Sequence, residues 1–276
     1  MAAETAPRAT AAQGAAQGNE PILLRDIHEG VATLTLNRPA QYNALSEELL
    51  GALQEALDGI ASDDSLRVVV LAGAGKAFCA GHDLKQMRSN PDRDYYRALF
   101  ARCSGVMQTI TRMPQPVIAR VQGIACAAGC QLVATCDLAV AAEEARFGTN
   151  GINAGLFCST PSVALSRNVR RKRSFEMLMT GDLIDAQTAV DYGLINRAVP
   201  AAELDGAVME LAQKIAAKTP VAVKAGKEMF YKQIEMDLAE AYAYAGEVMA
   251  CNMMAEDVGE GIDAFGEKRK PVWKGR

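Results

Sequence analysis

The sequence is poor in the residues that build metal centres, membrane spans and nucleic-acid surfaces. Its 276 residues include only two histidines, His28 and His82, and no two cysteines are separated by two residues. A zinc site would need thiolates at unsuitable spacing, so we expect no metal and no bound cofactor. No apolar run approaches the ~18 residues that span a bilayer. The net charge of −4 gives no general attraction to nucleic acid or anionic lipid, so neither is an expected partner.

The cysteines and the first residues bear on where the protein resides. Seven cysteines occur in apolar or small-residue contexts, a pattern typical of small buried hydrophobes in a reducing compartment. Residues 1–19 are rich in Ala, Gln and Gly and lack the apolar stretch of a secretory leader. They predict a disordered tail. The sequence therefore predicts a cytoplasmic protein.

Up to about residue 160, strand-like segments alternate with segments of helical periodicity. Strands are expected at 21–26, 31–36, 67–71, 116–121 and 137–142, and helices at 46–60, 95–113 and 129–135. This order favours parallel pairing within an α/β domain. After about residue 160 the sequence shows no further strand pattern, and helices are expected at 185–192, 202–218, 221–256 and 260–268.

Two blocks of small residues each follow a strand-like segment and precede a segment that can be helical. They are Phe78-Cys-Ala-Gly-His-Asp-Leu84 and Gly123-Ile-Ala-Cys-Ala-Ala-Gly-Cys-Gln131. Small residues let backbone N–H groups approach a ligand without intervening side chains. Two such turns, brought together, can aim two amides at one oxygen atom. That is the arrangement of an oxyanion hole, which stabilises charge developing on a carbonyl.

Seven motifs mark the chain between about Ile22 and Trp273. They are Leu36-Asn-Arg-Pro39 with Asn43-Ala-Leu45, Ala77-Phe-Cys-Ala-Gly-His-Asp-Leu84, Gly123 to Asp137, Ala145-Arg-Phe-Gly148, Thr180-Gly-Asp-Leu-Ile-Asp-Ala186, Tyr192-Gly-Leu-Ile-Asn196 and Glu260-Gly-Ile-Asp-Ala-Phe265. In this order they resemble the crotonase superfamily, the enoyl-CoA hydratases and isomerases. Residues 155–160, 230–233 and 268–273 most resemble its subgroup of the enoyl-CoA hydratase domain-containing protein 3 type, whose name does not settle the chemistry.

The resemblance implies an α/β fold in which a spiral of ββα units, residues 20–200, binds an acyl-CoA thioester. A C-terminal helical region, 201–276, would form a homotrimer or a dimer of trimers. The oxyanion amides would be those of His82 and Ala128. Contacts to CoA would come from the first block, a nearby loop and the last helix, here Ala40, Gln41, Tyr42, Ala80, His82, Asp83, Leu84, Lys85, Phe265, Lys268 and Lys270. For the terminal basic residues, a solvated face is an equally good interpretation.

The chain departs from the family at the acid/base pair. Hydratases carry glutamates where Gln131 and Gly151 stand here. Each such group contributes about 10²–10⁴-fold to the rate. A glutamine amide can orient water but cannot take its proton, so we expect weak hydration and doubtful isomerisation. Restoring glutamate at both positions is expected to raise the hydration rate.

Three functions stay open: an enolate-stabilising hydratase-family enzyme, a decarboxylase of malonyl-type thioesters, and a non-catalytic acyl-CoA binder. Decarboxylases of the superfamily also show Gly-His-Asp at 81–83 and need no base, although they carry a tyrosine where Cys158 stands. Cys158 is either a nucleophile assisted by His82 or, more simply, a small buried hydrophobe. Glu143 and Glu144 are expected in an exposed loop, and Asp137 in a structural hydrogen bond or ion pair.

Overall fold

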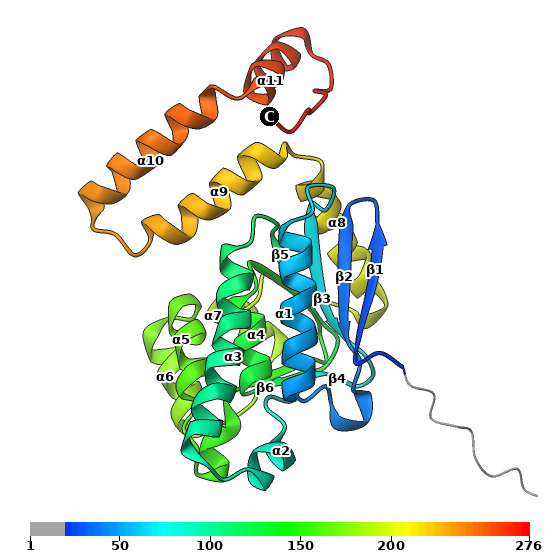
Figure 1. Cartoon of the computed structure of the whole chain (residues 1–276), viewed down its shortest axis with the longest axis vertical. Helices are drawn as coiled ribbons and strands as arrows, with labels where there is room; N and C mark the ends of the chain where they lie inside the picture. Colours follow the sequence, from blue (N-terminus) through cyan, green and yellow to red (C-terminus); the bar gives the residue numbers. More distant parts are fainter. Residues whose placement is uncertain (1–19) are drawn as a thin grey trace, which may run out of the picture.

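The computed structural model describes residues 20–276, in which two β-sheets are wrapped by helices (Figure 1). The six-stranded sheet has the order β1-β2-β3-β5-β7-β10, and the four-stranded sheet has the order β4-β6-β8-β9. In the large sheet only β1 runs antiparallel to its neighbour. The expected parallel α/β architecture is confirmed, whereas the predicted disordered tail at 1–19 lies outside the described residues.

The core repeats one unit, in which a strand of the large sheet is followed by a strand of the small sheet and then by helix. The first unit is β3 Val68–Gly73, β4 Ala77–Cys79, α2 Leu84–Ser89 and α3 Arg93–Arg112. The second is β5 Val117–Val121, β6 Ile124–Cys126 and α4 Ala128–Thr135. The third is β7 Leu138–Ala142, β8 Arg146–Gly148, the 3₁₀ turn η2 Asn150–Ala154, α5 Ser159–Asn168 and α6 Arg171–Thr180. These successive units form the predicted ββα spiral.

The hairpin of β1 Leu23–His28 and β2 Val31–Leu36, the turn η1 Pro39–Gln41 and helix α1 Glu47–Ala61 precede the first unit. Ser46 caps α1, as predicted, because its hydroxyl accepts a hydrogen bond from the Leu49 N–H. One face of the large sheet packs against α1, α3 and α4 through side chains such as Leu34 and Leu71. The opposite face, which includes Val68 and Val140, packs against α8 Leu204–Ala216.

The expectation that strands stop after about residue 160 is wrong. β9 Ile184–Asp185 joins the small sheet beside β8, and β10 Arg197–Val199 joins the large sheet beside β7. Both strands are too short for a period-two pattern to be recognised in the sequence. Helix α7 Ala186–Tyr192 and the turn η3 Ala201–Glu203 complete this part of the chain.

The C-terminal helices α9 Pro220–Gln233 and α10 Leu238–Met253 form an antiparallel pair that extends beyond the sheets, followed by α11 Glu256–Glu267 (Figure 1). The single helical segment expected at 221–256 is therefore wrong. Its break has a local cause, because the Asp237 carboxylate accepts a hydrogen bond from the Glu240 N–H and starts α10. Helix α8 packs on the large sheet, so only α9 to α11 lie outside the core; the division at residues 200 and 201 stays a prediction.

A buried ion pair docks α9 onto the core. The Lys227 ammonium donates to the Asp137 carboxylate at 2.7 Å and to the carbonyl oxygens of Ile110 and Gln115. The Tyr231 hydroxyl donates to the other oxygen of Asp137 at 2.8 Å. Every charged atom of this pair has partners, as burial requires. Asp137 thus has the structural role that the sequence suggested.

Candidate active site

The two small-residue blocks become two neighbouring turns. β4 and β6 are parallel partners in the small sheet, so their carboxyl ends meet at one edge. After β4 the chain turns at Gly81, which has φ = +96°, a value that favours glycine. After β6 it turns at Ala127 and enters α4. The second turn is also tied to β8, because the Ala127 N–H donates to the Gly148 carbonyl at 2.9 Å.

Glycine is required because the turns interlock. A Cβ on Gly81 would lie 3.0 Å from the Ala127 Cβ and 3.3 Å from the Ala128 nitrogen. A Cβ on Gly129 would lie 2.0 Å from the Cys79 carbonyl oxygen, at the end of β4. Each turn therefore occupies the space that a side chain of the other would need. The two amides at positions 82 and 128 are carried by backbones in direct contact.

The orientation of the His82 peptide follows from its pairing with Leu45. The Leu45 N–H donates to the Gly81 carbonyl at 2.8 Å, and the Asp83 N–H donates to the Leu45 carbonyl at 3.2 Å. This is an isolated parallel bridge that uses the groups on both sides of His82. In extended backbone, successive N–H groups point in opposite directions, so the His82 N–H points away from Leu45. Within residues 20–276 it has no protein acceptor.

The Ala128 amide is the first N–H of α4, whose eight residues are all buried. The first N–H groups of a helix have no intrahelical acceptor, and the helix dipole adds positive potential there. The preceding residue, Ala127, has φ = +48° and ψ = −116°, a conformation that residues with a Cβ rarely adopt. Such strain costs about 1–3 kcal/mol and persists only where surrounding structure enforces it. It sets the direction in which the Ala128 N–H points.

The His82 imidazole is held apart from polar partners. It packs edge-on against Phe100 of α3, with ring centroids 5.4 Å apart. Both ring nitrogens are buried and have no hydrogen-bond partner in the described part of the chain. Burial lowers the pKa of His82 to about 4, so the ring is neutral near pH 7. It therefore adds neither a positive charge nor a negative one to the neighbourhood of the amides.

The two positions that carry glutamate in hydratases are occupied differently. Gln131 lies one helical turn beyond Ala128 and is 4% exposed, and its Oε1 has no partner among the residues that the structure describes. A Cβ at Gly151 would lie 2.7 Å from the Leu156 carbonyl oxygen and 2.8 Å from the Cys158 sulfur. The turn at 150–158 has closed over the space a glutamate would use. The expectation that glutamate at both positions raises activity therefore applies to residue 131 alone.

The other acid/base and nucleophile candidates lie in unfavourable surroundings. Burial raises the pKa of Cys158, which keeps its thiol protonated and favours its interpretation as a small buried hydrophobe. All seven cysteines are free, and six are buried. Glu143 and Glu144 are exposed and precede β8, whose opposite end, at Gly148, contacts the second turn.

The residues predicted to contact CoA fall into two groups. Ala40, Gln41 and Tyr42 adjoin the 80–85 segment, because the Ala80 N–H donates to the Tyr42 carbonyl at 3.0 Å. Ala80, Leu84 and Lys85 are exposed beside them. The Asp83 carboxylate is different, because Arg38 and the first amides of α2 occupy it.

The second group lies elsewhere. Phe265, Lys268 and Lys270 belong to α11 and the residues after it, at the opposite end of the molecule from α2 (Figure 1). They cannot reach the turns of their own chain. A role for them requires a neighbouring subunit.

In the loop before α1, the sequence interpretation assigned CoA contacts to Ala40, Gln41 and Tyr42 but no role to Arg38 or Asn43. Arg38 and Asn43 are in a motif that supported the family resemblance, but their contacts join segments more than 30 residues apart. The side chain of Asn43 is fully buried and donates to the carbonyls of Ala74 and Ala77. A fully buried Asn in a loop predicts such tethering, but the sequence alone does not reveal that burial.

Comparison with known proteins agrees with the fold and motifs. Residues 26–276 match the family model described as enoyl-CoA hydratase/isomerase. Human enoyl-CoA hydratase domain-containing protein 3, mitochondrial, is 46% identical over 245 residues, which cover 89% of this chain and 81% of that protein. Its crystal structure has a TM-score of 0.90 at 45% identity, covering 92% of this chain and 100% of that one. A crystal structure of an enoyl-CoA hydratase from Mycobacterium smegmatis has a TM-score of 0.91 at 60% identity, covering 92% and 99%.

These relatives overturn one prediction and confirm the family. Similar proteins from human, mouse, rat, Xenopus laevis and Danio rerio are all named mitochondrial, which contradicts the predicted cytoplasmic location. Within residues 20–276 no helix has both the length and the apolar character needed to cross a bilayer. The fold is that of the crotonases, and the chain belongs to the enoyl-CoA hydratase/isomerase family.

Proposed function

We propose that the chain binds an acyl-CoA thioester where the two turns meet, and that the amides of His82 and Ala128 stabilise the enolate of that thioester. The observation that carries this proposal is the interlocking of the two turns, together with two N–H groups that have no acceptor within residues 20–276. Two fixed donors suit an oxygen whose negative charge grows during reaction. The burial of α4 supports the proposal because donors in a site shielded from water act more strongly.

The same site is poorly equipped to move protons. Position 131 carries an amide, and position 151 has no room for a side chain. Hydration of a conjugated thioester needs a group that takes a proton from water and returns it. We therefore expect crotonyl-CoA to bind but to be hydrated at a small fraction of a typical family rate.

Calorimetry and a hydration assay on purified protein test both statements. We expect saturable binding of crotonyl-CoA, slow turnover, and a faster rate in Gln131→Glu. Hydration at a typical family rate in the unmodified chain would contradict the chemical proposal. Absence of CoA-ester binding would contradict the site itself.

A decarboxylase is the second candidate, and the neutral surroundings of the amides favour it. Loss of CO₂ from a malonyl-type thioester produces the enolate directly, so it requires an oxyanion hole without a base. The neutral His82 ring beside one amide adds no negative charge that would repel the substrate carboxylate. CO₂ release from malonyl-, methylmalonyl- and ethylmalonyl-CoA tests this candidate. If all three bind without turnover, and a broad thioester panel yields no product, the chain is a non-catalytic acyl-CoA binder.

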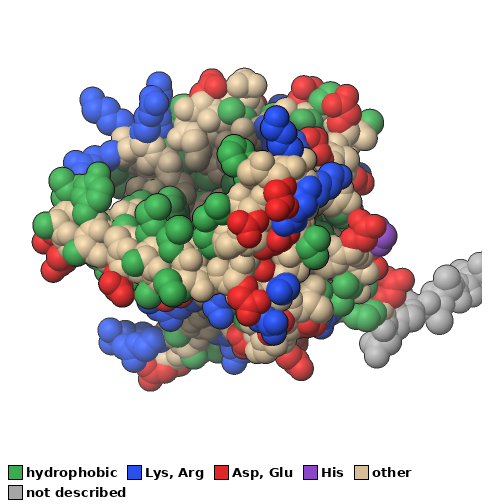
Figure 2. Space-filling view, turned by 90° about the horizontal axis from the view of Figure 1, so that it is seen from above, with side chains coloured by type: hydrophobic (Ala, Val, Ile, Leu, Met, Phe, Trp, Pro, Cys, Tyr) green, Lys and Arg blue, Asp and Glu red, His purple; other side chains and the backbone are tan. Residues whose placement is uncertain are grey.

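The C-terminal helices supply the argument for self-assembly. Exposed large apolar side chains lie on α10, α11 and the segment between them, and Figure 2 looks onto this end of the molecule. They include Leu238, Tyr242, Met249, Met254 and Phe265, which are 70–87% exposed. Leaving such a surface in water is unfavourable, and we propose that neighbouring copies cover it in a trimer or a dimer of trimers. Phe265, Lys268 and Lys270 would then approach a neighbour's CoA.

The mass of the assembly in solution tests this part of the proposal. Phe265→Asp should shift the measured mass toward that of one subunit. A monomeric unmodified protein would contradict it.

A further inference from the structure

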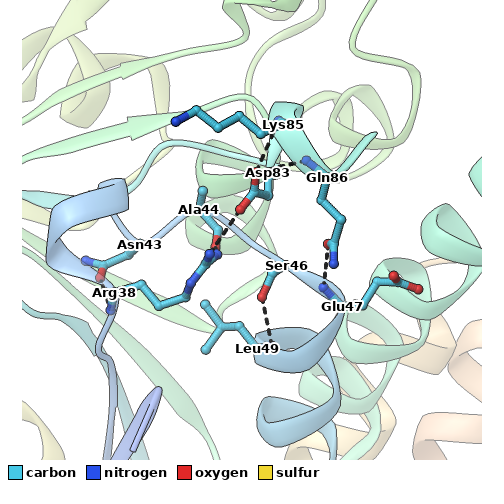
Figure 3. A network of polar contacts seen from close by, with 9 residues as sticks. All are labelled: Arg38, Asn43, Ala44, Ser46, Glu47, Leu49, Asp83, Lys85 and Gln86. Atoms are coloured by element: carbon cyan, nitrogen blue, oxygen red, sulfur yellow. Dashed lines mark hydrogen bonds and ion pairs between the residues drawn. The ribbon is translucent and has the colours of Figure 1, made fainter. Parts of the chain in front are cut away.

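We propose that Arg38 is a positioning residue that holds the His82 N–H in its productive direction by acting through Asp83 and the Ala44 carbonyl. This inference rests on the proposed function, because it concerns one of the two oxyanion amides. It adds to the proposed site a residue, Arg38, that does not contact the thioester. Figure 3 shows the polar network that carries the argument.

The guanidinium of Arg38 joins two segments. One nitrogen, Nη1, donates to the Ala44 carbonyl at 2.5 Å, and the other, Nη2, donates to the Asp83 Oδ2 at 3.0 Å (Figure 3). Both side chains of the ion pair are mostly buried, with 19% and 16% exposed. A planar guanidinium can make both contacts at fixed geometry, whereas an ammonium cannot. Arg38 therefore fixes the distance between residue 44 and residue 83.

These are the residues that flank the bridge around His82. Ala44 precedes Leu45, and Asp83 follows His82, so the ion pair spans the same junction as the two Leu45 hydrogen bonds. If residue 83 moved relative to residue 44, the peptide plane of His82 would rotate with it. Replacing Arg38 would therefore change the N–H direction without replacing any residue predicted to contact CoA.

Asp83 transmits the restraint because its other oxygen is also occupied. Oδ1 accepts hydrogen bonds from the Lys85 and Gln86 N–H groups, which begin α2. Although partial burial opposes ionisation, the hydrogen bond from Arg38 and the two amides hold the pKa of Asp83 below its usual value. The carboxylate is thus charged at neutral pH and links Arg38 to the segment that carries His82.

The loop that carries Arg38 is itself rigid. The Arg38 N–H donates to the Asn43 side-chain oxygen at 2.9 Å. The Asn43 amide nitrogen donates to the carbonyls of Ala74 and Ala77 at 2.9 and 2.8 Å. These bonds attach Arg38 to β4 and to the residue that follows β3. The restraint on His82 therefore originates in the core, not in a free surface loop.

The infrared stretch of a bound thioester carbonyl measures the effect directly, because hydrogen bonds to its oxygen lower the frequency. We would bind butyryl-CoA labelled with ¹³C at the carbonyl to the unmodified chain and to Arg38→Met, Arg38→Lys and Asp83→Asn. The affinity of the same proteins for free CoA would be measured in parallel. Arg120→Met is the matched control, since Arg120 pairs with Asp205 between the large sheet and α8, away from the turns.

We expect Arg38→Met to lose at least half of the frequency shift while its CoA affinity changes by less than about threefold. Arg38→Lys should lose an intermediate part, because a single ammonium cannot bridge both partners in the same geometry. Arg120→Met should keep the full shift. If Arg38 had only a structural role, Arg38→Met and Arg120→Met would both change the stability of the fold, and neither would change the carbonyl frequency.

The outcomes separate this inference from the function on which it rests. No shift in the unmodified chain would overturn the proposed oxyanion hole itself. A normal shift there, retained in Arg38→Met, would overturn only the role of Arg38. If Arg38→Met does not fold, Asp83→Asn decides, because asparagine still caps α2 but removes the charge. A full shift in Asp83→Asn overturns the inference, and a reduced one supports it.

Discussion

The two turns of the candidate site present equivalent amides but are held in place by different means. The Gly81–His82 turn is fixed by polar contacts with the 38–47 segment, including one ion pair. The Ala127–Ala128 turn is fixed by close packing, a strained backbone and the Ala127–Gly148 backbone hydrogen bond, and no charged side chain of residues 20–276 is bonded to it. Packing excludes other geometries through repulsion, whereas an ion pair selects one through attraction. The first turn should therefore respond to charge and pH, and the second to volume.

The largest effect is expected where volume is added to the second turn. In Gly129→Ala the new methyl group would lie 2.0 Å from the Cys79 carbonyl oxygen, so β4 or α4 must move. Overpacking of this severity should lower the free energy of unfolding by about 3 kcal/mol or more. Urea unfolding measures it.

Gly59→Ala is the control, because a Cβ at this glycine of α1 meets no described atom within 4 Å. It should be neutral or stabilising by up to about 1 kcal/mol. Equal destabilisation in both variants would show that the close approach at Gly129 is not what fixes the second turn.

The next effect is expected in Gly81→Ala, which crowds both turns at their contact. Its methyl group would meet Ala127 at 3.0 Å, on a backbone with φ = +96°. We expect a loss of about 2–3 kcal/mol in the free energy of unfolding from strain and crowding. The carbonyl shift of a bound thioester should largely disappear.

Gly155→Ala separates these two causes. Gly155 also has a positive φ, +80°, but a Cβ there meets no atom of residues 20–276 within 4 Å. It should cost only the backbone strain, about 1 kcal/mol, and leave the carbonyl shift intact. A lost carbonyl shift in this variant as well would show that the infrared signal reports general destabilisation.

The first turn should also make the protein sensitive to mild acid through His82. Its pKa is about 4 in the folded chain and 6.5 as an ordinary histidine, so the unfolded chain binds more protons between these values. Folding stability therefore decreases as the pH falls through this window. From pH 6.5 to 4.5 the loss should be about 2 kcal/mol.

Thermal and urea unfolding between pH 6.5 and 4.5 measure how steeply the free energy of unfolding depends on pH. His82→Phe should remove the part of this pH dependence that comes from His82. His28→Gln, at an exposed position of β1, is the control for the loss of a histidine. If His82→Phe keeps the full slope, the buried neutral imidazole is not its source.

The smallest effect is expected from relieving strain in the second turn. Glycine adopts the positive φ of residue 127 without the penalty that alanine incurs. Against this gain stands the greater freedom of glycine in the unfolded chain. We expect Ala127→Gly to gain about 1 kcal/mol, while Ala128→Gly, at the buried first position of α4, should lose about 1 kcal/mol with its methyl group. A loss in both variants, measured by urea unfolding, would show that Ala127 is not strained.

Sequence patterns predicted the long elements of the fold well. Helix α1 has its cap at Ser46, and α3, β3, β5 and β7 lie within about two residues of the expected ranges. The sequence analysis gave no strand for β4, β6, β8, β9 or β10, which consist of two or three residues, and no helix for α2, α5 or α6. It also missed the break between α9 and α10. Short strands are specified by their neighbours and not by their own periodicity. That information is absent from a local window of sequence.

For the site, the sequence identified the turns but not their supports. His82, Ala128, Gln131 and Gly151 were all named from motifs. The contact between Arg38 and Asp83 spans 45 residues, and its importance depends on the Leu45 bridge lying beside it. No local pattern reports such a distance.

The sequence by itself determined that Gly81 and residues 127–129 are small and that positions 131 and 151 lack carboxylates, because residue type fixes local sterics and charge. Tertiary structure alone decided that the turns interlock, that the His82 N–H points away from Leu45, and that the space beside Gly151 is closed. These features arise from the parallel pairing of β4 with β6 and from packing between distant segments. Strand register and close packing are properties of the assembled chain, and no single segment encodes them.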